Sequence, residues 1–305
     1  MKPVTILILL ACLLVLRLFI AILSALSGCA GHPDTKALPD NFKLSMPLHI
    51  TRQGIIVTTY WGAAGLHKEL LWDNDSPTWI NDISLMNASS VTSYKTPIFA
   101  TTTADGTRIK GEVYSCDTVS LGRVTFVNVP FYKIAGPMQG AFGANLISKG
   151  IWEINFKKNI LIFTSSIDSL ADAGQGSLLP ADFTDNTIWM RLGFKGGGTR
   201  LLQLDLGFNG GLLLPSKDFR QLTRGSLHID TQMKQFSTPG STNELKTSIV
   251  SDTVYIGKVP FATVVCANEL ASERLIGLGF FQHFEWLILD YKARRVYGRL
   301  TSRLD

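Results

Sequence analysis

The chain has 305 residues and a formal net charge of +5, with Lys and Arg scattered along it. A length of this size suits two domains or one large one. The charge is too weak and too dispersed to indicate a nucleic-acid partner. The five histidines show no ligand spacing, so we expect no metal site and no cofactor; they are His32, His49, His67, His228 and His283.

The first segment of the chain is an apolar leader. Residues 4 to 28 are almost entirely apolar, with Arg17 in the middle, and they end at Leu26-Ser27-Gly28-Cys29. This ending resembles a bacterial lipobox, in which a lipidated cysteine becomes the first residue of the mature protein. Arg17 leaves 18–25 as a short core of signal-peptide length. The alternative is an uncleaved membrane anchor, within which Arg17 would be costly.

The leader therefore predicts a lipoprotein signal peptide over 1–28, lipidation at Cys29 and a linker over 29–46. Either form of the leader places the globular part outside the cytoplasm. We expect a bacterial cell-envelope lipoprotein, anchored to a membrane and facing the periplasm or the cell surface.

The remaining chain is predicted to be rich in β-strands. Alternating or β-branched residues indicate strands at 48–60, 108–114, 124–129, 160–164, 201–204, 212–214, 248–256 and 286–289. Turn signals separate them at 104–107, 196–198 and 239–241, and short helical signals occur at 145–149, 216–222 and 280–284. Residues 164–183, rich in Ser, Ala, Asp and Gly, are predicted to connect two halves.

An internal repeat divides the chain into those halves. Residues 117–126 recur as 252–261, at an offset of 135, with six identities in ten positions, and Asp117 corresponds to Asp252. Residues 142–157 recur in the same way as 276–292. The order and near-constant offset indicate a duplicated domain. We predict two similar lobes related by an approximate two-fold axis, over 47–163 and 184–305.

Two cysteines, Cys116 and Cys266, lie outside the leader. Two cysteines do not make a disulfide framework, and pairing would depend on a geometry that a sequence does not give. Two separate, semi-buried thiols are favoured over a disulfide.

Each half contains an apolar run that reaches an acidic residue at the start of a turn. In the second half, Gln203-Leu204 lead to Asp205 and then Gly207; in the first half, Leu71-Trp72 lead to Asp73. Both carboxylates would therefore lie at strand ends, where they could meet. A pair of facing carboxylates that shares one proton is the working part of an aspartic protease.

These elements together resemble the pepsin and retropepsin superfamily, and more narrowly the bacterial secreted two-lobe aspartyl-protease-like proteins. The resemblance covers about residues 47 to 300 and includes an apolar-apolar-Gly element in each half, ending at Gly143 and Gly277. It implies a mainly β fold of two acid-protease β-barrel lobes. It also implies that Asp73 and Asp205 form the catalytic dyad, and that hairpins near Asp105-Gly106 and Pro239-Gly240 are flaps over a cleft.

The catalytic signature of the superfamily, Asp-Thr/Ser-Gly, is intact in neither half. The second residue normally supplies a hydroxyl that braces the two loops; here it is Asn74, which can form hydrogen bonds, and Leu206, which cannot. The third residue is normally glycine, which allows close backbone approach. Gly207 retains it, whereas Asp75 adds a third carboxylate that is expected to raise a neighbouring pKa or force the loop open.

The resemblance implies an aspartyl-protease-like protein that binds a peptide or protein segment between its lobes. The departures from the Asp-Thr/Ser-Gly signature predict that its peptidase activity is weak or absent. One alternative is an active aspartic endopeptidase, a peptide hydrolase of the cell envelope. Another is a non-catalytic module that binds a peptide or protein segment along an exposed strand edge.

Overall fold

The structure is a computed structural model that describes residues 38–83, 90–103, 108–170, 173–223, 229–238, 241–268 and 271–301. The leader predicted over 1–28 and its Cys29 lie outside the described residues, so both stay predictions. Within the described part of the chain, no helix is long and apolar enough to cross a membrane.

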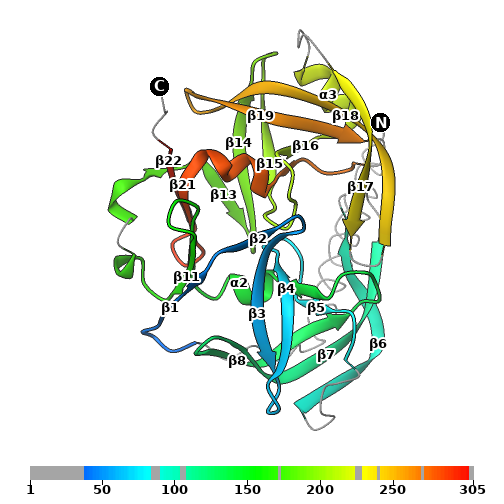
Figure 1. Ribbon diagram of the computed structural model, residues 1–305, viewed down its shortest axis with the longest axis vertical. Coiled ribbons are helices and arrows are strands. Elements are labelled where there is room, and N and C mark those ends of the chain that lie inside the picture. Colours follow the sequence, from blue (N-terminus) through cyan, green and yellow to red (C-terminus); the bar gives the residue numbers. More distant parts are fainter. Residues whose placement is uncertain are drawn as a thin grey trace, which may run out of the picture. The chain divides into compact units, whose positions relative to one another are not determined.

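The first half of the chain forms an eight-stranded sheet (Figure 1). The order is β2-β3-β4-β9-β5-β8-β7-β6, and β3 also pairs with β7. Its strands are β2 (His49–Thr51), β3 (Gly54–Trp61), β4 (Leu66–Trp72), β5 (Trp79–Ile80), β6 (Val91–Thr102), β7 (Arg108–Leu121), β8 (Val124–Lys133) and β9 (Gly140–Phe142).

The second half repeats this sheet strand for strand. The order is β13-β14-β15-β20-β16-β19-β18-β17, and β14 also pairs with β18. Asp117 lies on β7 and Asp252 on β18, which take equivalent places, so the predicted duplication is confirmed. The strands are β13 (Ala181–Thr184), β14 (Thr187–Phe194), β15 (Thr199–Leu204), β16 (Leu212–Leu213), β17 (Asp230–Thr238), β18 (Ser241–Ile256), β19 (Val259–Asn268) and β20 (Leu275–Ile276).

A six-stranded sheet contains strands of both halves. Its order is β1-β11-β10-β21-β22-β12, and β10 pairs antiparallel with β21, so the halves are hydrogen-bonded to each other at its centre. One strand of the segment predicted to be a connection, β12, lies at its edge. The strands are β1 (Lys43–Pro47), β10 (Ile151–Asn155), β11 (Ile160–Thr164), β12 (Ser177–Leu178), β21 (Phe284–Asp290) and β22 (Arg295–Leu300).

Within the described residues, helices are few and short, as the sequence predicts. They are α2 (Ala144–Ile147), α3 (Ser216–Leu222) and the 3-10 turns η2 (Ile167–Ser169), η3 (Ala173–Gln175) and η4 (Leu278–His283). The helix predicted over 280–284 is this last 3-10 turn, and Phe284 already belongs to β21.

Aromatic side chains fill the core. The rings of Trp152 and Phe163 are stacked with their centroids 4.2 Å apart, and Phe126 stacks on Phe163 in turn. In the second half, Phe261 stacks on Phe284 at 5.7 Å. Burial of each such side chain stabilises the fold by about 1.5–3 kcal/mol, so the packing fixes the central sheet against both eight-stranded sheets.

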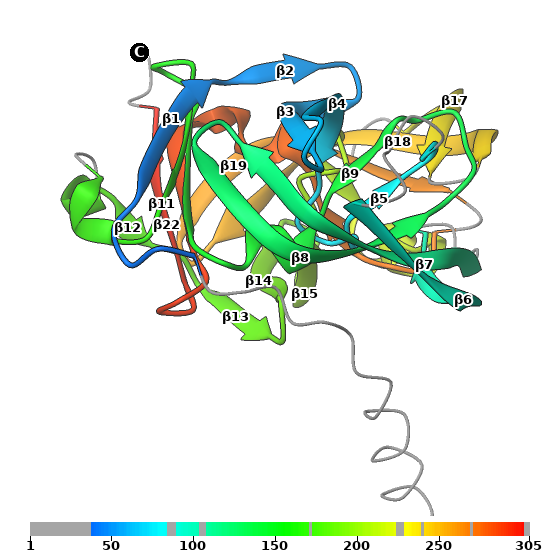
Figure 2. The ribbon, with the colours of Figure 1, turned by 90° about the horizontal axis from the view of Figure 1, so that it is seen from below.

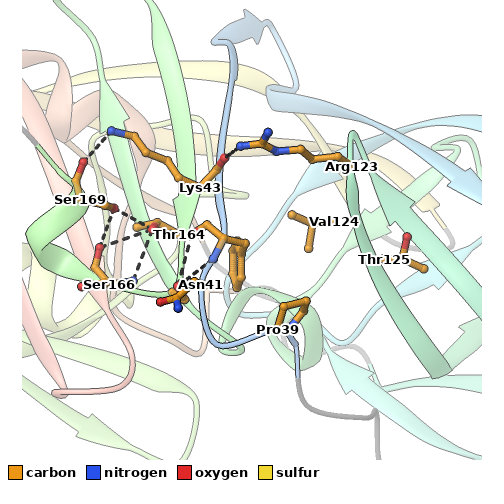
Figure 3. A pocket seen from close by; sticks show the side chains of 11 residues that line it. Pro39, Asn41, Lys43, Arg123, Val124, Thr125, Thr164, Ser166 and Ser169 are labelled. Carbon is orange, nitrogen blue, oxygen red and sulfur yellow. Dashed lines mark hydrogen bonds between the residues drawn. The ribbon is translucent and has the colours of Figure 1, made fainter.

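Strand β1 is fastened to the first half by hydrogen bonds around a pocket of about 520 Å³ (Figure 3). The Lys43 ammonium donates to the Ser169 carbonyl at 2.5 Å, and the Arg123 guanidinium donates to the Lys43 carbonyl. Phe42, just before the strand, packs on Phe163 with ring centroids 4.7 Å apart. The charged side chains of Lys43 and Arg123 therefore both form hydrogen bonds that hold β1 in place.

Cys116 and Cys266 are both buried and free. The prediction of two separate thiols is confirmed.

Candidate functional site

Asp73 and Asp205 occupy equivalent places at the ends of strands β4 and β15. The N–H of Asp73 donates to the carbonyl of Phe142 at 3.1 Å, and the N–H of Asp205 donates to the carbonyl of Ile276 at 3.0 Å. Each acid thus follows a strand that pairs in parallel with the apolar-apolar-Gly element of its own half. The strand-end position predicted for both carboxylates is confirmed.

Gly143 and Gly277 lie directly against the two acidic loops. A Cβ on Gly143 would lie 2.2 Å from the carbonyl carbon of Pro77, and one on Gly277 would lie 2.4 Å from the carbonyl oxygen of Phe208. Contacts this short leave no room for a side chain, so glycine is required at both positions for the loops to pack.

Asn74 joins the two loops. Its side-chain nitrogen donates to the carbonyl of Leu204 at 2.7 Å, and its side-chain oxygen accepts from the N–H of Leu206 at 2.8 Å. The Asn74 side chain is 1% exposed, and Leu206 is fully buried. Because one amide satisfies a donor and an acceptor of the other loop, the loops are braced although Leu206 carries no hydroxyl.

Another hydrogen bond between the halves lies at the surface. The exposed Asn209 donates from its side chain to the carbonyl of Arg52 at 2.6 Å.

Gly207 brings the loop of Asp205 against the carboxyl group of Asp73. A Cβ on Gly207 would lie 2.5 Å from Cγ of Asp73 and 2.8 Å from both of its carboxyl oxygens. Gly207, the glycine that the second signature retains, therefore allows the backbone to contact the carboxyl group of Asp73.

Backbone N–H groups orient both carboxyl groups. Oδ1 of Asp73 accepts from the N–H of Asp75 at 3.0 Å and from the N–H of Ser76 at 3.2 Å. Oδ1 of Asp205 accepts from the N–H of Phe208 at 3.1 Å. These bonds favour the ionised carboxylates and hold them in fixed orientations.

Burial nevertheless raises the pKa of both acids. The pKa of Asp73 is raised by desolvation, which outweighs its backbone hydrogen bonds. The pKa of Asp205 is raised well above its usual value by desolvation and, after that, by the negative charges of Asp73 and Asp75. The charge of Asp73 therefore acts on Asp205, so the two carboxyl groups titrate in dependence on each other.

Asp75 is the third member of this acidic cluster. Burial and then the charge of Asp73 raise its pKa to about 7, while an interaction with the Gln203 side chain favours its ionised form. The carboxyl group of Glu273 adds to the negative field. The expected rise in pKa beside a third carboxylate is therefore present, and the loop is nonetheless closed by Asn74.

The sequence motifs did not assign three further side chains to this cluster, namely Gln203, Glu273 and Tyr291. The buried Tyr291 side chain lies near Asn74 and Asp75, and its pKa is raised by burial first and then by the charge of Asp75. The role of Gln203 could have been inferred, because it lies on β15 two positions before Asp205, a spacing that directs both side chains to the same side of the chain.

The two predicted flap hairpins are formed by β6 with β7 and by β17 with β18. Their strands are paired up to Thr102 and Arg108 and up to Thr238 and Ser241. The tips, with Asp105-Gly106 and Pro239-Gly240, lie outside the described residues.

Among the described residues, no group of three or more His, Cys, Asp and Glu side chains could hold a metal ion.

Comparison with solved structures identifies the architecture. An aspartic proteinase from Irpex lacteus matches with a TM-score of 0.57 and 16% identity, over 86% of this chain and 98% of that one. Conglutin gamma, a basic 7S globulin from lupine seeds, matches at 0.57, and the basic 7S globulin from soybean at 0.56, both with 10% identity over 86% of this chain and 96% of theirs. No protein-family model and no curated protein sequence matches the chain.

At these identities the likeness shows the fold alone. The two similar eight-stranded sheets match the bilobal pepsin-like fold, as the sequence predicts. The catalytic roles of Asp73 and Asp205 and the supporting roles of Asn74, Asp75, Leu206 and Gly207 stay predictions.

Proposed function

We propose that this protein binds an extended peptide segment between its two lobes and hydrolyses it with the carboxyl groups of Asp73 and Asp205. The observation that carries the proposal is the Asn74 bridge, with bonds of 2.7 and 2.8 Å to the opposite loop. An aspartic dyad needs two acids held in fixed register, and this bridge supplies the brace that the signature lacks.

The proposed chemistry uses one proton shared by the two acids. One carboxylate takes a proton from a water molecule as that water attacks the peptide carbonyl carbon, and the protonated partner donates to the carbonyl oxygen. The tetrahedral intermediate then breaks its C–N bond as the carboxyl group that took the water proton gives it to the nitrogen, and the other carboxylate regains a proton from a hydroxyl of the intermediate as the new C=O bond forms. The raised pKa of Asp205, caused by burial and by the charges of Asp73 and Asp75, favours a singly protonated dyad up to higher pH.

A second function, peptide binding without cleavage, is supported by Asp75. This residue stands where the signature has glycine, and its carboxyl group adds to the charge around the dyad. In that case a peptide would pair with an exposed strand edge and remain intact.

Cleavage of a mixed peptide library from acidic to neutral pH tests the first function. We expect cleavage to be lost in Asp73→Asn and in Asp205→Asn, and kept in the control Asp117→Asn, which changes an exposed aspartate on β7. Peptides that bind but stay intact in the unmodified protein would establish the second function instead.

We further propose that the protein is a bacterial envelope lipoprotein, attached to a membrane through Cys29. The small residues that precede this cysteine support the proposal.

A further inference from the structure

Three arginines converge on a pocket of about 370 Å³ in the second half of the chain. Arg191 comes from β14, Arg294 from the turn between β21 and β22, and Arg295 from the start of β22. The segment 178–182, which includes β12 and the start of β13, forms the rest of the lining. In Figure 2, β12, β13 and β22 lie on the same side of the molecule, and β12 pairs with β22. We call this the arginine pocket.

The positive charge of the arginine pocket is only partly offset by its surroundings. Its only acidic lining residue is Asp182, and among the described residues no carboxylate forms an ion pair with any of the three guanidinium groups. Asp290, which pairs with Arg295 in the hairpin, adds negative charge near it, and the Arg295 guanidinium donates to the Tyr297 hydroxyl at 3.5 Å. Arg294 donates to the carbonyl of Phe183, which uses one of its five N–H donors. The three arginines are exposed, so water and salt weaken their mutual repulsion, and a bound anion would further reduce it.

The first half of the chain is an internal control, because it builds the same hairpins without these charges. Asn155 pairs with Ile160 as Asp290 pairs with Arg295, so Asn159 and Ile160 are the counterparts of Arg294 and Arg295. In the same way Ile56 pairs with Leu71 as Trp189 pairs with Gln203, which makes Thr58 the counterpart of Arg191. The fold therefore needs no cation at these three positions.

The backbone conformation of Arg294 also indicates that the fold does not require an arginine at this position. Arg294 has a φ of 56° and its counterpart Asn159 a φ of 57°, both in the left-handed region. Asparagine tolerates this region, whereas a long side chain does so rarely. A residue kept in a disfavoured conformation points to a functional demand on its side chain.

We propose that the arginine pocket binds the phosphate group of a phosphorylated ligand. Guanidinium groups match phosphate oxygens with paired hydrogen bonds, and three of them supply both the charge and the directionality that such a group needs. Leu178, at the rim, is 61% exposed and offers apolar contact to the part of the ligand beyond the phosphate. The phosphate could come from a lipid headgroup or from a free phosphate ester.

Titration calorimetry of the full chain with inorganic phosphate, at constant ionic strength set by chloride, tests the proposal. The variant Arg191→Thr/Arg294→Asn/Arg295→Ile installs the residues of the first half, and we expect it to lose at least tenfold in phosphate affinity. Arg294→Asn alone should also weaken binding while its melting temperature without phosphate is equal to or above that of the unmodified protein. The control Arg220→Asn, on the exposed face of α3, should bind normally.

Vesicles distinguish the two sources of phosphate. If the ligand is a lipid, the triple variant loses binding to vesicles of phosphatidylglycerol but not to phosphatidylcholine, relative to the unmodified protein. If it is a free phosphate ester, only the calorimetric affinity changes. Phosphate binding that all variants share, or that chloride abolishes, would mean an adventitious ion only and would overturn the proposal.

Discussion

The backbone N–H of Leu206 donates a hydrogen bond of 2.8 Å to the side-chain oxygen of Asn74, which lies 132 positions earlier in the chain. The same side-chain amide donates to the carbonyl of Leu204. A single buried side chain of the first half therefore holds the backbone on both sides of Asp205, and the register of the two acids depends on it.

Asn74→Ala should lower the free energy of unfolding by about 2–4 kcal/mol, because it leaves a buried N–H and a buried carbonyl without partners. Chemical denaturation measures this loss. The matched control is Asn209→Ala, which removes an exposed hydrogen bond between the halves and should change stability by about 0.5 kcal/mol or less. Equal effects of the two substitutions would contradict a special role for Asn74.

Gly207→Ala should remove peptidase activity and destabilise the fold by roughly 1–3 kcal/mol, because its Cβ would lie 2.5 Å from Cγ of Asp73. Gly174→Ala is the control, since a Cβ there would meet no atom within 4 Å. Peptide cleavage and thermal melting are the measurements. Cleavage at the normal rate by the Gly207→Ala variant would show that Asp73 does not need this contact.

Asp75→Asn should move the high-pH limb of peptidase activity to lower pH. The charge of Asp75 raises the pKa of Asp205, after the larger effect of burial, so its removal lets the dyad lose its shared proton at lower pH. We expect a displacement of roughly one pH unit, a usual size for such perturbations. Cleavage rates from pH 3 to 8 check it; a variant that is active with an unmoved profile would exclude this role.

The folded protein should lose stability as the pH rises from about 4 to 7. The pKa of Asp73, Asp75 and Asp205 is raised in the folded state, to about 7 for Asp75, so the folded protein binds more protons than the unfolded chain over this range. Stability is then fully present below the ordinary pKa near 4 and falls as the pH rises through the folded values. Thermal melting at constant ionic strength measures the slope, which should be smaller in Asp75→Asn. A stability that increases over this range would contradict the assignment.

Cys29→Ser should abolish lipid labelling and leave an unprocessed precursor, because lipidation and cleavage both require the thiol at this position. Metabolic labelling with a fatty acid and the size of the product are the readouts. Cys12→Ser, a change within the same leader, should leave both unaffected. If Cys29→Ser is still labelled and processed, the leader is an anchor of another kind.

The sequence by itself determined the duplication, the strand-rich composition and the two acids at strand ends. These features are local or repeated: Asp117 and Asp252 stand in matching motifs, and Asp73 and Asp205 each end an apolar run, so residue type and spacing reveal them. The resemblance of these motifs to the pepsin-like lobes then indicated the architecture that the structure shows.

Only the tertiary structure shows how the fold accommodates Asn74, Asp75 and Leu206, which depart from the Asp-Thr/Ser-Gly signature. The sequence shows that Asn74 can form hydrogen bonds, but its partners at Leu204 and Leu206 are 130 and 132 positions away and meet it only when the two halves pair through β10 and β21. Likewise, Arg191 and Arg294 reach one pocket because a hairpin of one sheet packs beside the end of another. Contacts between segments so far apart depend on the assembled sheets, whereas the periodicity of a sequence reports only the local direction of each side chain.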